Sequence, residues 1–198
     1  MRATIGFTVK SGWACAVLVS GTADARVLVE TRRVELSDPA NPDARQPYHA
    51  GFGTARDSGQ GLSTLVASVR RFGRSSVTGL IRDYQSGHTV RGAGVVVGSL
   101  IDPQTIANDH IRIHALEGQL FRGVVTDAAE RRGVRCAVWR ERDIWGEGIK
   151  TLKRPEKELR GIVSALGGNV EGPWRAEHKA ATLAAWLVLA RRPPAARH

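Results

Sequence analysis

Two histidines and a glutamate are spaced so that one face of a helix would carry all three. His110, His114 and Glu117 occupy positions i, i+4 and i+7, which places the two imidazoles about one turn apart. Imidazole nitrogens and carboxylate oxygens are ligands for Zn²⁺ and other transition metals. The spacing therefore predicts a metal site on this helix, with Asp102 as a further ligand. A solvated helix face with a local ion pair fits the same pattern.

A second group combines an aromatic residue with clustered cations. Stacking on an aromatic ring together with phosphate pairing suits a bent or single-stranded nucleic acid. Five acidic residues share the segment from 139 to 160, so an exposed helix with i,i+4 ion pairs is the alternative interpretation. The predicted nucleic-acid-binding residues are Lys10, Trp139, Arg140, Arg142, Lys150, Lys153 and Arg154.

The charge balance is consistent with a nucleic-acid partner but does not require one. Twenty-nine Lys and Arg against 19 Asp and Glu give the 198-residue chain a formal net charge of +10. Most of these cations are arginine, which a GC-rich coding bias alone would produce. The segment 101–130 differs from the rest, since it holds five acidic side chains and two basic ones. The candidate metal ligands therefore lie in an acidic island.

The composition indicates a globular domain that needs no disulfide or structural metal. A chain of this length buries roughly 70% of its unfolded surface, and 42% of the residues are hydrophobic. Cys15 and Cys136 each lie in an apolar run and are expected to be inert core thiols in a reducing compartment. The apolar stretch 180–190 is too short to cross a bilayer. We expect a cytoplasmic protein without a membrane partner.

The elements that must position these residues follow from periodicity and turn signals. Thr4–Val9, Trp13–Ser20 and Ala25–Leu36 are rich in strand-forming residues and are separated by short turns, which predicts an antiparallel meander. Residues 37–60 hold three prolines and three glycines and are expected to form a long loop insertion. A single domain is expected over 1–198, with a disordered tail at 191–198.

Helices and strands alternate after the meander. Apolar spacing predicts two short helices between Gly61 and Tyr84, separated at Gly73. A buried strand is expected at Gly94–Leu100, then a helix that opens near Asn108. A fifth strand at 135–140, helical structure over 143–166 and a last helix at 175–190 complete the order. The prediction is an α/β protein with a mixed five-stranded sheet, a three-strand antiparallel meander followed by two strands in α/β crossovers, flanked by helices.

This order of elements is that of the ribonuclease H-like fold, and several segments permit a narrower comparison. The segment Ala115–Val125, with Gly118-Gln119 and Arg122-Gly123, resembles a helix of RuvC-type Holliday junction resolvases. Residues 133–139, 156–163 and 179–190 resemble the following strand and the later helices of that family, and 5–14 resembles its first hairpin. The resemblance implies a nucleic-acid-binding protein, with structured or branched DNA as the ligand, and a homodimer.

The residues that would carry the family's chemistry differ in this chain. The resemblance implies two divalent metals held by carboxylates from the first strand, the end of the fourth strand and the last helix. Thr8 takes the first position, Gly98-Ser99 the second, and Lys179 or Thr182 the third. We therefore expect a pseudo-nuclease that binds nucleic acid.

Two alternatives remain open. A rebuilt site with Asp102, His110 and His178 as catalytic residues would make the protein a metal-dependent nuclease or phosphodiesterase that uses Mg, Mn or Zn. A protein-interaction scaffold is the other possibility. No phosphate-binding loop or dinucleotide fingerprint is found in the sequence.

Overall fold

The structure is a computed structural model that describes residues 1–49 and 59–191. Within them, five strands form one mixed sheet in the order β3-β2-β1-β4-β5. Neighbours among the first three strands pair antiparallel, while β4 runs parallel to β1 and to β5. The predicted meander followed by two crossover strands is confirmed. The strands are β1 (Arg2–Lys10), β2 (Trp13–Gly21), β3 (Arg26–Glu35), β4 (Thr89–Val97) and β5 (Cys136–Arg140).

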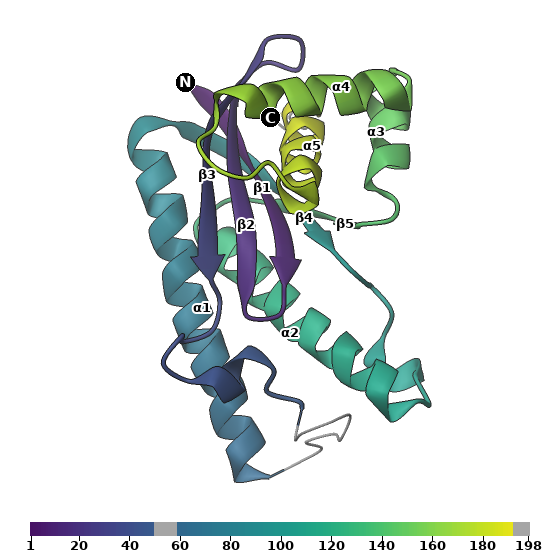
Figure 1. The fold of residues 1–198 in the computed structure, drawn as a ribbon. Helices are drawn as coiled ribbons and strands as arrows, with labels where there is room; N and C mark the ends of the chain where they lie inside the picture. The colour runs from purple at the N-terminus through teal and green to yellow at the C-terminus, as the bar shows by residue number, and fades with distance from the viewer. Residues whose placement is uncertain (50–58, 192–198) are drawn as a thin grey trace, which may run out of the picture.

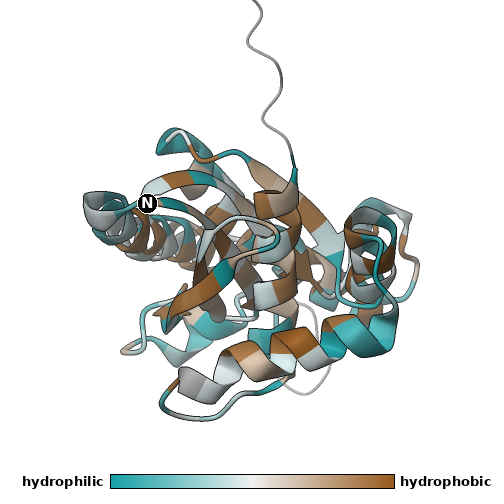
Figure 2. Ribbon diagram, turned by 90° about the horizontal axis from the view of Figure 1, so that it is seen from above, coloured by the Kyte–Doolittle hydropathy of each residue, from teal (hydrophilic) through white to brown (hydrophobic). Residues whose placement is uncertain are grey.

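Helices cover both faces of the sheet (Figure 1). One face packs against α1 and α2, and the other against α5, which α3 and α4 cover in turn. Seen from above, the apolar stretches concentrate in the strands and in the helix surfaces that face them (Figure 2). The helices are α1 (Gln60–Gly87), α2 (Asp109–Arg131), α3 (Ile144–Leu152), α4 (Glu156–Leu166) and α5 (Ala176–Ala190), with 3-10 turns η1 (Pro42–Arg45), η2 (Pro103–Thr105) and η3 (Gly167–Asn169).

Strand β1 is central because each of its faces meets a different helical layer. Ile5 and Phe7 are fully buried in the cluster formed with α1 and α2, and burial of each contributes about 1.5–3 kcal/mol. The alternate residues Thr4 and Thr8 face α5, where their hydroxyls donate to the carbonyls of Ala185 and Glu177, both at 2.8 Å. These two bonds fix α5 antiparallel to β1.

Two glycines let α5 lie directly on the sheet. A Cβ added to Gly6 would stand 1.8 Å from the Ala181 carbonyl oxygen, and one added to Gly94 would stand 2.6 Å from that of Ala184. Both distances are shorter than van der Waals contact, so the close approach of helix and sheet requires glycine at these positions. Trp186 of α5 is buried, and its Nε1 donates to the Ala23 carbonyl at 3.0 Å.

The prediction of two short helices before β4 is wrong, because α1 is continuous through Gly73. A Cβ at Gly73 would lie 2.6 Å from Val124 Cγ1 and 2.8 Å from the Leu36 carbonyl oxygen. This glycine therefore allows α1 to pack closely against α2 and the end of β3. The sequence pattern did not separate a glycine required for packing from one that ends a helix.

Other boundaries differ by a few residues from the prediction. β4 begins at Thr89 and ends at Val97, so Gly98–Leu100 lie beyond the strand. The 37–60 segment contains the turn η1, and its residues 50–58 lie outside the described part, as do residues 192–198 of the predicted tail. Among the described helices, none is long and apolar enough to span a membrane.

Candidate functional site

The helix α2 carries a glutamate whose side chain is fully enclosed. Glu117 has a relative exposure of 0%, although a carboxylate without partners is costly to bury. Its Oε1 lies 2.8 Å from His49 Nδ1, and its Oε2 lies 3.5 Å from the Ser11 hydroxyl. Burial raises the pKa of Glu117, while hydrogen bonds from His49, Ser11 and the Tyr48 backbone act in the opposite direction. Two segments distant in the sequence, residues 48–49 and the turn at Ser11, thus reach one carboxyl group of α2.

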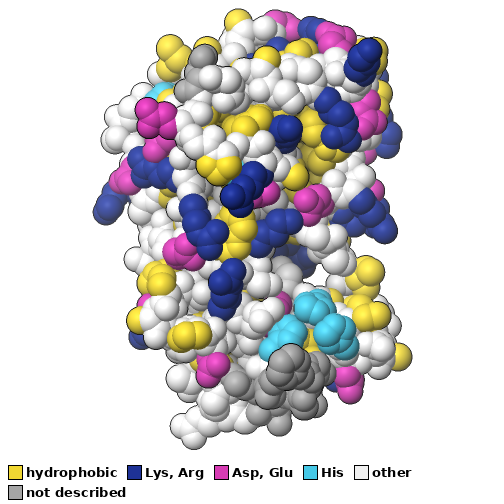
Figure 3. All heavy atoms as spheres, viewed as in Figure 1, with side chains coloured by type: hydrophobic (Ala, Val, Ile, Leu, Met, Phe, Trp, Pro, Cys, Tyr) yellow, Lys and Arg dark blue, Asp and Glu magenta, His cyan; other side chains and the backbone are white. Residues whose placement is uncertain are grey.

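Two imidazoles, those of His49 and His114, lie beside this carboxyl group, and the ring of His110 adjoins them. His110 and His114 are one turn apart on α2, and their Nε2 atoms lie 3.3 Å apart. The ring centroid of His49 is 5.0 Å from that of His114 and 6.5 Å from that of His110. Burial, together with the neighbouring His49 and His110, lowers the pKa of His114. This shift favours the neutral imidazole, which is the form that binds metals. Figure 3 shows the gathered histidines at the edge of a hollow in this face.

The arrangement has the donor set and spacing of a metal site. The ligand atoms of His49, His114 and Glu117 all lie within 4.8 Å of one another, and they form the one such group of three in residues 1–49 and 59–191. Zn²⁺ binds nitrogen and oxygen ligands at about 2.0–2.2 Å, so tetrahedral ligands stand roughly 3.3 Å from each other. The His49 and Glu117 atoms that now share a hydrogen bond at 2.8 Å would move slightly apart, and His114 would move closer, to reach that geometry.

The predicted ligand set is thus brought together in part. His110, His114 and Glu117 share one face of α2, as their spacing predicted, and the helix begins at Asp109 with Asn108 as its cap. Asp102 does not join them, because its Oδ1 accepts from the Gln104 backbone N–H and caps η2.

His49 is a member of the cluster that no motif or spacing predicted. This residue lies in the proline- and glycine-rich segment 37–60, and it precedes Glu117 by 68 positions in the sequence. The one hint was the neighbouring aromatic Tyr48, which packs against the core. Phe52, the other aromatic of that segment, lies outside the described residues.

His178 lies apart from the other predicted catalytic residues. It sits in the first turn of α5, where its Nδ1 accepts from the Arg175 backbone N–H at 3.3 Å. Its ring packs 5.7 Å from that of Trp174, and burial lowers its pKa. The predicted trio of Asp102, His110 and His178 does not form one cluster in the described part of the chain.

The three places where the resemblance implies metal-binding carboxylates do meet in space. Thr8 pairs with Val96 of β4, two residues before Gly98. The Thr8 hydroxyl donates to the Glu177 carbonyl at the start of α5. Thr182, one turn further along α5, donates its hydroxyl to the His178 carbonyl at 2.8 Å. The Thr8 hydroxyl therefore ties α5 to β1, whereas the Thr182 hydroxyl bonds within α5 itself.

Four of the seven predicted nucleic-acid-binding residues gather at the carboxyl end of β5, whereas Lys153 and Arg154 lie beyond the last residue of α3. A pocket of about 630 Å³ is lined by Trp139, Arg140, Arg142 and Lys150, together with Leu100 and Ile101. Trp139 is only 8% exposed and packs in the core with α3 and α5. Its ring therefore offers little surface for stacking on a base, which disagrees with the predicted stacking role.

Most cations of this group have acidic partners, as the alternative interpretation expected. Arg140 pairs with Asp143, and Arg154 pairs with Glu158. Lys10 lies 2.9 Å from Glu141, and Lys150 lies 3.0 Å from Glu147. Such exposed pairs contribute at most about 1 kcal/mol each to stability, so a phosphate can displace the acidic partner at little cost.

Lys153, another predicted contact, caps the carboxyl end of α3 and adopts a left-handed backbone conformation with φ 55°.

Comparisons with known proteins identify the fold. No protein-family model matches the sequence, and no curated protein matches it either. Solved structures do match. RuvC of Thermus thermophilus has a TM-score of 0.57 at 12% identity, over 94% of this chain and 92% of that one. The same resolvase in complex with a Holliday junction substrate has a TM-score of 0.58, with the same identity and coverage. The chain therefore has the ribonuclease H-like fold of RuvC, and the predicted RuvC-like resemblance is confirmed at the level of the fold.

Proposed function

We propose that this RuvC-fold protein binds nucleic acid, with structured or branched DNA as its ligand, and lacks the two-metal carboxylate site of a nuclease. The observation that carries the proposal is Thr8. A carboxylate at this position would be the bridging ligand that the resemblance implies, and here a hydroxyl bonded to the Glu177 carbonyl takes its place. A hydroxyl cannot supply the negative charge that two divalent metals need.

Support for nucleic-acid binding comes from the fold and from charge. The fold is shared with a protein solved on a Holliday junction substrate. The net charge of +10 favours association with phosphates through counterion release. Arg142 and Lys150 line the pocket at the end of β5, and their side chains are 70% and 75% exposed. We propose that these two side chains make the main contacts with the phosphates of the nucleic acid.

The test is a binding measurement by fluorescence anisotropy with a four-way junction, a duplex and a single strand. We expect the double variant Arg142→Gln/Lys150→Gln to bind the junction about tenfold more weakly than the unmodified protein. The matched control is Arg71→Gln, which removes an exposed charge from α1 on the other side of the sheet. Absence of saturable, salt-sensitive binding to all three DNAs would overturn the proposal in favour of a protein-interaction scaffold.

Cleavage is tested separately on the same junction. With Mg²⁺ or Mn²⁺ present, we expect the strands to remain intact. Accumulation of nicked product that depends on the added metal would show that a nuclease site exists, and would refute the pseudo-nuclease part of the proposal while leaving the binding part intact.

The His49, His114 and Glu117 cluster supports a second candidate function, a metal-dependent phosphodiesterase with a rebuilt site. The observation that favours it is the convergence of three possible ligands around a buried carboxyl group. A bound Zn²⁺ or Mn²⁺ would lower the pKa of a water ligand and so generate a nucleophile near neutral pH.

A thermal melt with added Zn²⁺ or Mn²⁺ tests this candidate. At a metal concentration a hundred times the Kd, binding stabilises the native state by about 2.7 kcal/mol, which for a chain of this size raises Tm by roughly 5–10 °C. We expect His114→Ala and Glu117→Gln to lose this shift, and the control His88→Ala, a histidine outside the cluster, to keep it. An equal shift in all variants would rule out the cluster as the metal site.

A further inference from the structure

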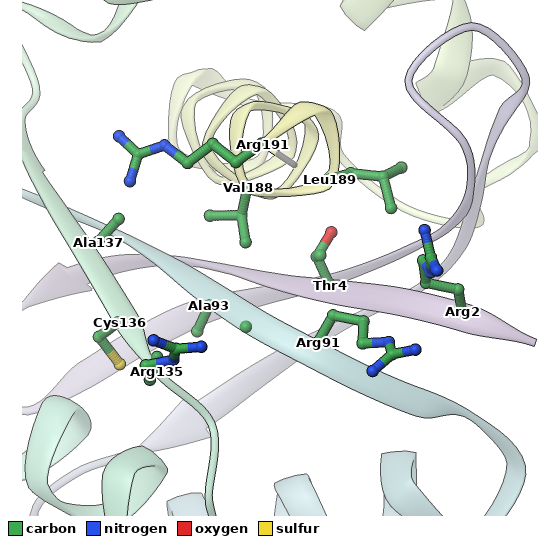
Figure 4. Close-up of a pocket in the computed structure, with 11 residues that line it drawn as sticks. Arg2, Thr4, Arg91, Ala93, Arg135, Cys136, Ala137, Val188, Leu189 and Arg191 are labelled. Atoms are coloured by element: carbon green, nitrogen blue, oxygen red, sulfur yellow. The ribbon is translucent and has the colours of Figure 1, made fainter. Parts of the chain in front are cut away.

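A second pocket lies at the opposite end of β5 from the one described above. Its volume is about 370 Å³, and it is formed where the amino ends of β1, β4 and β5 meet the carboxyl end of α5. These strands are parallel neighbours, so their first residues share one edge of the sheet. Figure 4 shows α5 above the strands, with Val188 directed down toward them.

Four arginines line this pocket, and each belongs to a different element end. Arg2 opens β1 and Arg91 lies near the start of β4, whereas Arg135 directly precedes β5 and Arg191 directly follows α5. In Figure 4, Arg2 and Arg91 lie toward one end of the pocket, and Arg135 and Arg191 toward the other. Residues separated by up to 189 positions in the sequence thus present one type of side chain to one pocket.

Unlike most of the cations after β5, these guanidinium groups have no acidic partner in the described part of the chain. No aspartate or glutamate lines the pocket, and within the described residues the salt bridges include none from these four arginines. Arg191 does lie 4.9 Å above the Trp139 ring, which leaves its N–H groups free to donate. Each guanidinium carries five N–H donors in a planar fork that fits phosphate oxygens.

The electrostatic balance favours an anion with more than one charge. Four guanidinium groups around one pocket repel each other unless an anion neutralises them. The carboxyl end of α5 also faces this region, and its partial charge of about −0.5 is small against four positive charges. A ligand with at least two phosphate groups matches this excess.

The interior of the pocket limits the size of the ligand. Ala93, Ala137, Val188 and Leu189 supply an apolar lining, and Gly92 adds no side chain because a Cβ there would lie 2.9 Å from Val188 Cγ1. The volume falls in the range of small-molecule sites, about 300–1,000 Å³. A duplex backbone would contact only the rim of such a pocket.

We propose that this pocket binds a small phosphorylated compound with at least two phosphate groups. The site is separate from the proposed nucleic-acid contacts, and this proposal does not depend on them. Phosphodiesters of a nucleic acid share the same chemistry, so the experiment must distinguish the two sources.

The test is isothermal titration with inorganic tripolyphosphate at low salt, on the full chain. We expect saturable binding by the unmodified protein, and binding weakened at least about tenfold in Arg91→Gln/Arg135→Gln. Arg71→Gln again serves as the control, since it removes an exposed charge from the middle of α1, roughly 24 Å along that helix from its end near β4. The control should bind as the unmodified protein does. A second variant, Arg2→Gln, provides the same test if the double variant does not fold.

Three results would overturn the proposal. The first is that tripolyphosphate shows no saturable binding up to millimolar concentration. The second is that the pocket variants and Arg71→Gln lose the same amount of affinity for tripolyphosphate. The third is that tripolyphosphate does not bind and the pocket variants lose affinity for short single-stranded DNA without terminal phosphates. The last result would assign the arginines to the nucleic-acid surface. Retained junction binding by Arg91→Gln/Arg135→Gln would show that the two sites are independent.

Discussion

At the scale of single residues, burial decides what the titratable side chains of this protein can do. Glu117 is fully enclosed, and it tolerates this position because His49 lies within hydrogen-bond distance of its carboxylate. Loss of one partner of a buried pair typically costs about 3–5 kcal/mol. Exposed pairs such as Lys150 with Glu147 contribute far less. We therefore expect the enclosed contact between Glu117 and His49 to matter more for stability than the exposed ion pairs do.

The two cysteines give a prediction about reactivity. Burial raises the pKa of both Cys15 and Cys136 to about 12, so the reactive thiolate forms only as the pH rises toward that value. At mildly alkaline pH we expect neither thiol of the native protein to react with a disulfide reagent on a timescale of minutes. In denaturant both pKa values return to about 8.5, and both thiols should react at once.

The variant Cys15→Ser assigns any native reaction to Cys136, which is partly exposed at the arginine-lined pocket. Rapid labelling of native Cys136 would contradict the expected pKa and would mean that the surrounding guanidinium groups stabilise its thiolate.

At the scale of elements, the close contacts between helices and sheet depend on small residues. Gly6 and Gly94 allow α5 to pack closely on one face of the sheet, and Gly73 allows α1 to pack closely against α2 and the end of β3. The cost of adding a methyl group differs between glycines of the same helix, since a Cβ at Gly79 of α1 would meet nothing within 4 Å.

This contrast predicts opposite effects of the same substitution on stability. Gly73→Ala forces a methyl group against Val124 and the Leu36 backbone, and we expect a loss of about 1–3 kcal/mol in the free energy of unfolding. Gly79→Ala adds no clash and reduces the conformational freedom of the unfolded chain, and we expect a gain of about 0.5–1 kcal/mol. Urea denaturation followed by circular dichroism measures both. Equal effects of the two substitutions would show that α1 can shift away from α2.

At the scale of the whole molecule, the charge is divided among regions with different partners. The acidic segment 101–130 contributes Glu117 to the histidine cluster. The cations after β5 are largely paired with acids, and the arginines at the amino edge of the sheet form a group without acids. The net charge of +10 therefore combines an acidic segment, a region of paired cations and a group of arginines without acidic neighbours.

The salt dependence of DNA binding follows from this division. Each phosphate contact contributes about −0.9 to the slope of log K against log salt for duplex DNA. If Arg142 contacts a phosphate as proposed, Arg142→Gln should reduce the magnitude of that slope by about one. Binding isotherms at several salt concentrations measure it, with Arg71→Gln as the charge-matched control. An unchanged slope would remove Arg142 from the interface.

The order of elements could be predicted from the sequence because the signals for it are local. Alternating apolar residues indicated the strands, turn residues separated them, and the spacing of His110, His114 and Glu117 placed these three on one helix face, as the structure shows. Gly73 was misinterpreted because a glycine required for close packing and a glycine that ends a helix look the same without the packing partner. The predicted stacking role of Trp139 fails for a similar reason, since the burial of its ring depends on packing against α3 and α5.

By itself the sequence determined the order of the strands, the presence of Thr8 where the resemblance implies a carboxylate, and the acidic setting of the α2 histidines. Only the tertiary structure decided which distant groups meet. His49 reaches Glu117 across 68 positions, and four arginines reach one pocket because parallel strands bring their amino ends to the same edge of the sheet. Periodicity records which face of an element is buried, whereas contacts between elements depend on their crossing and register, which no local pattern encodes.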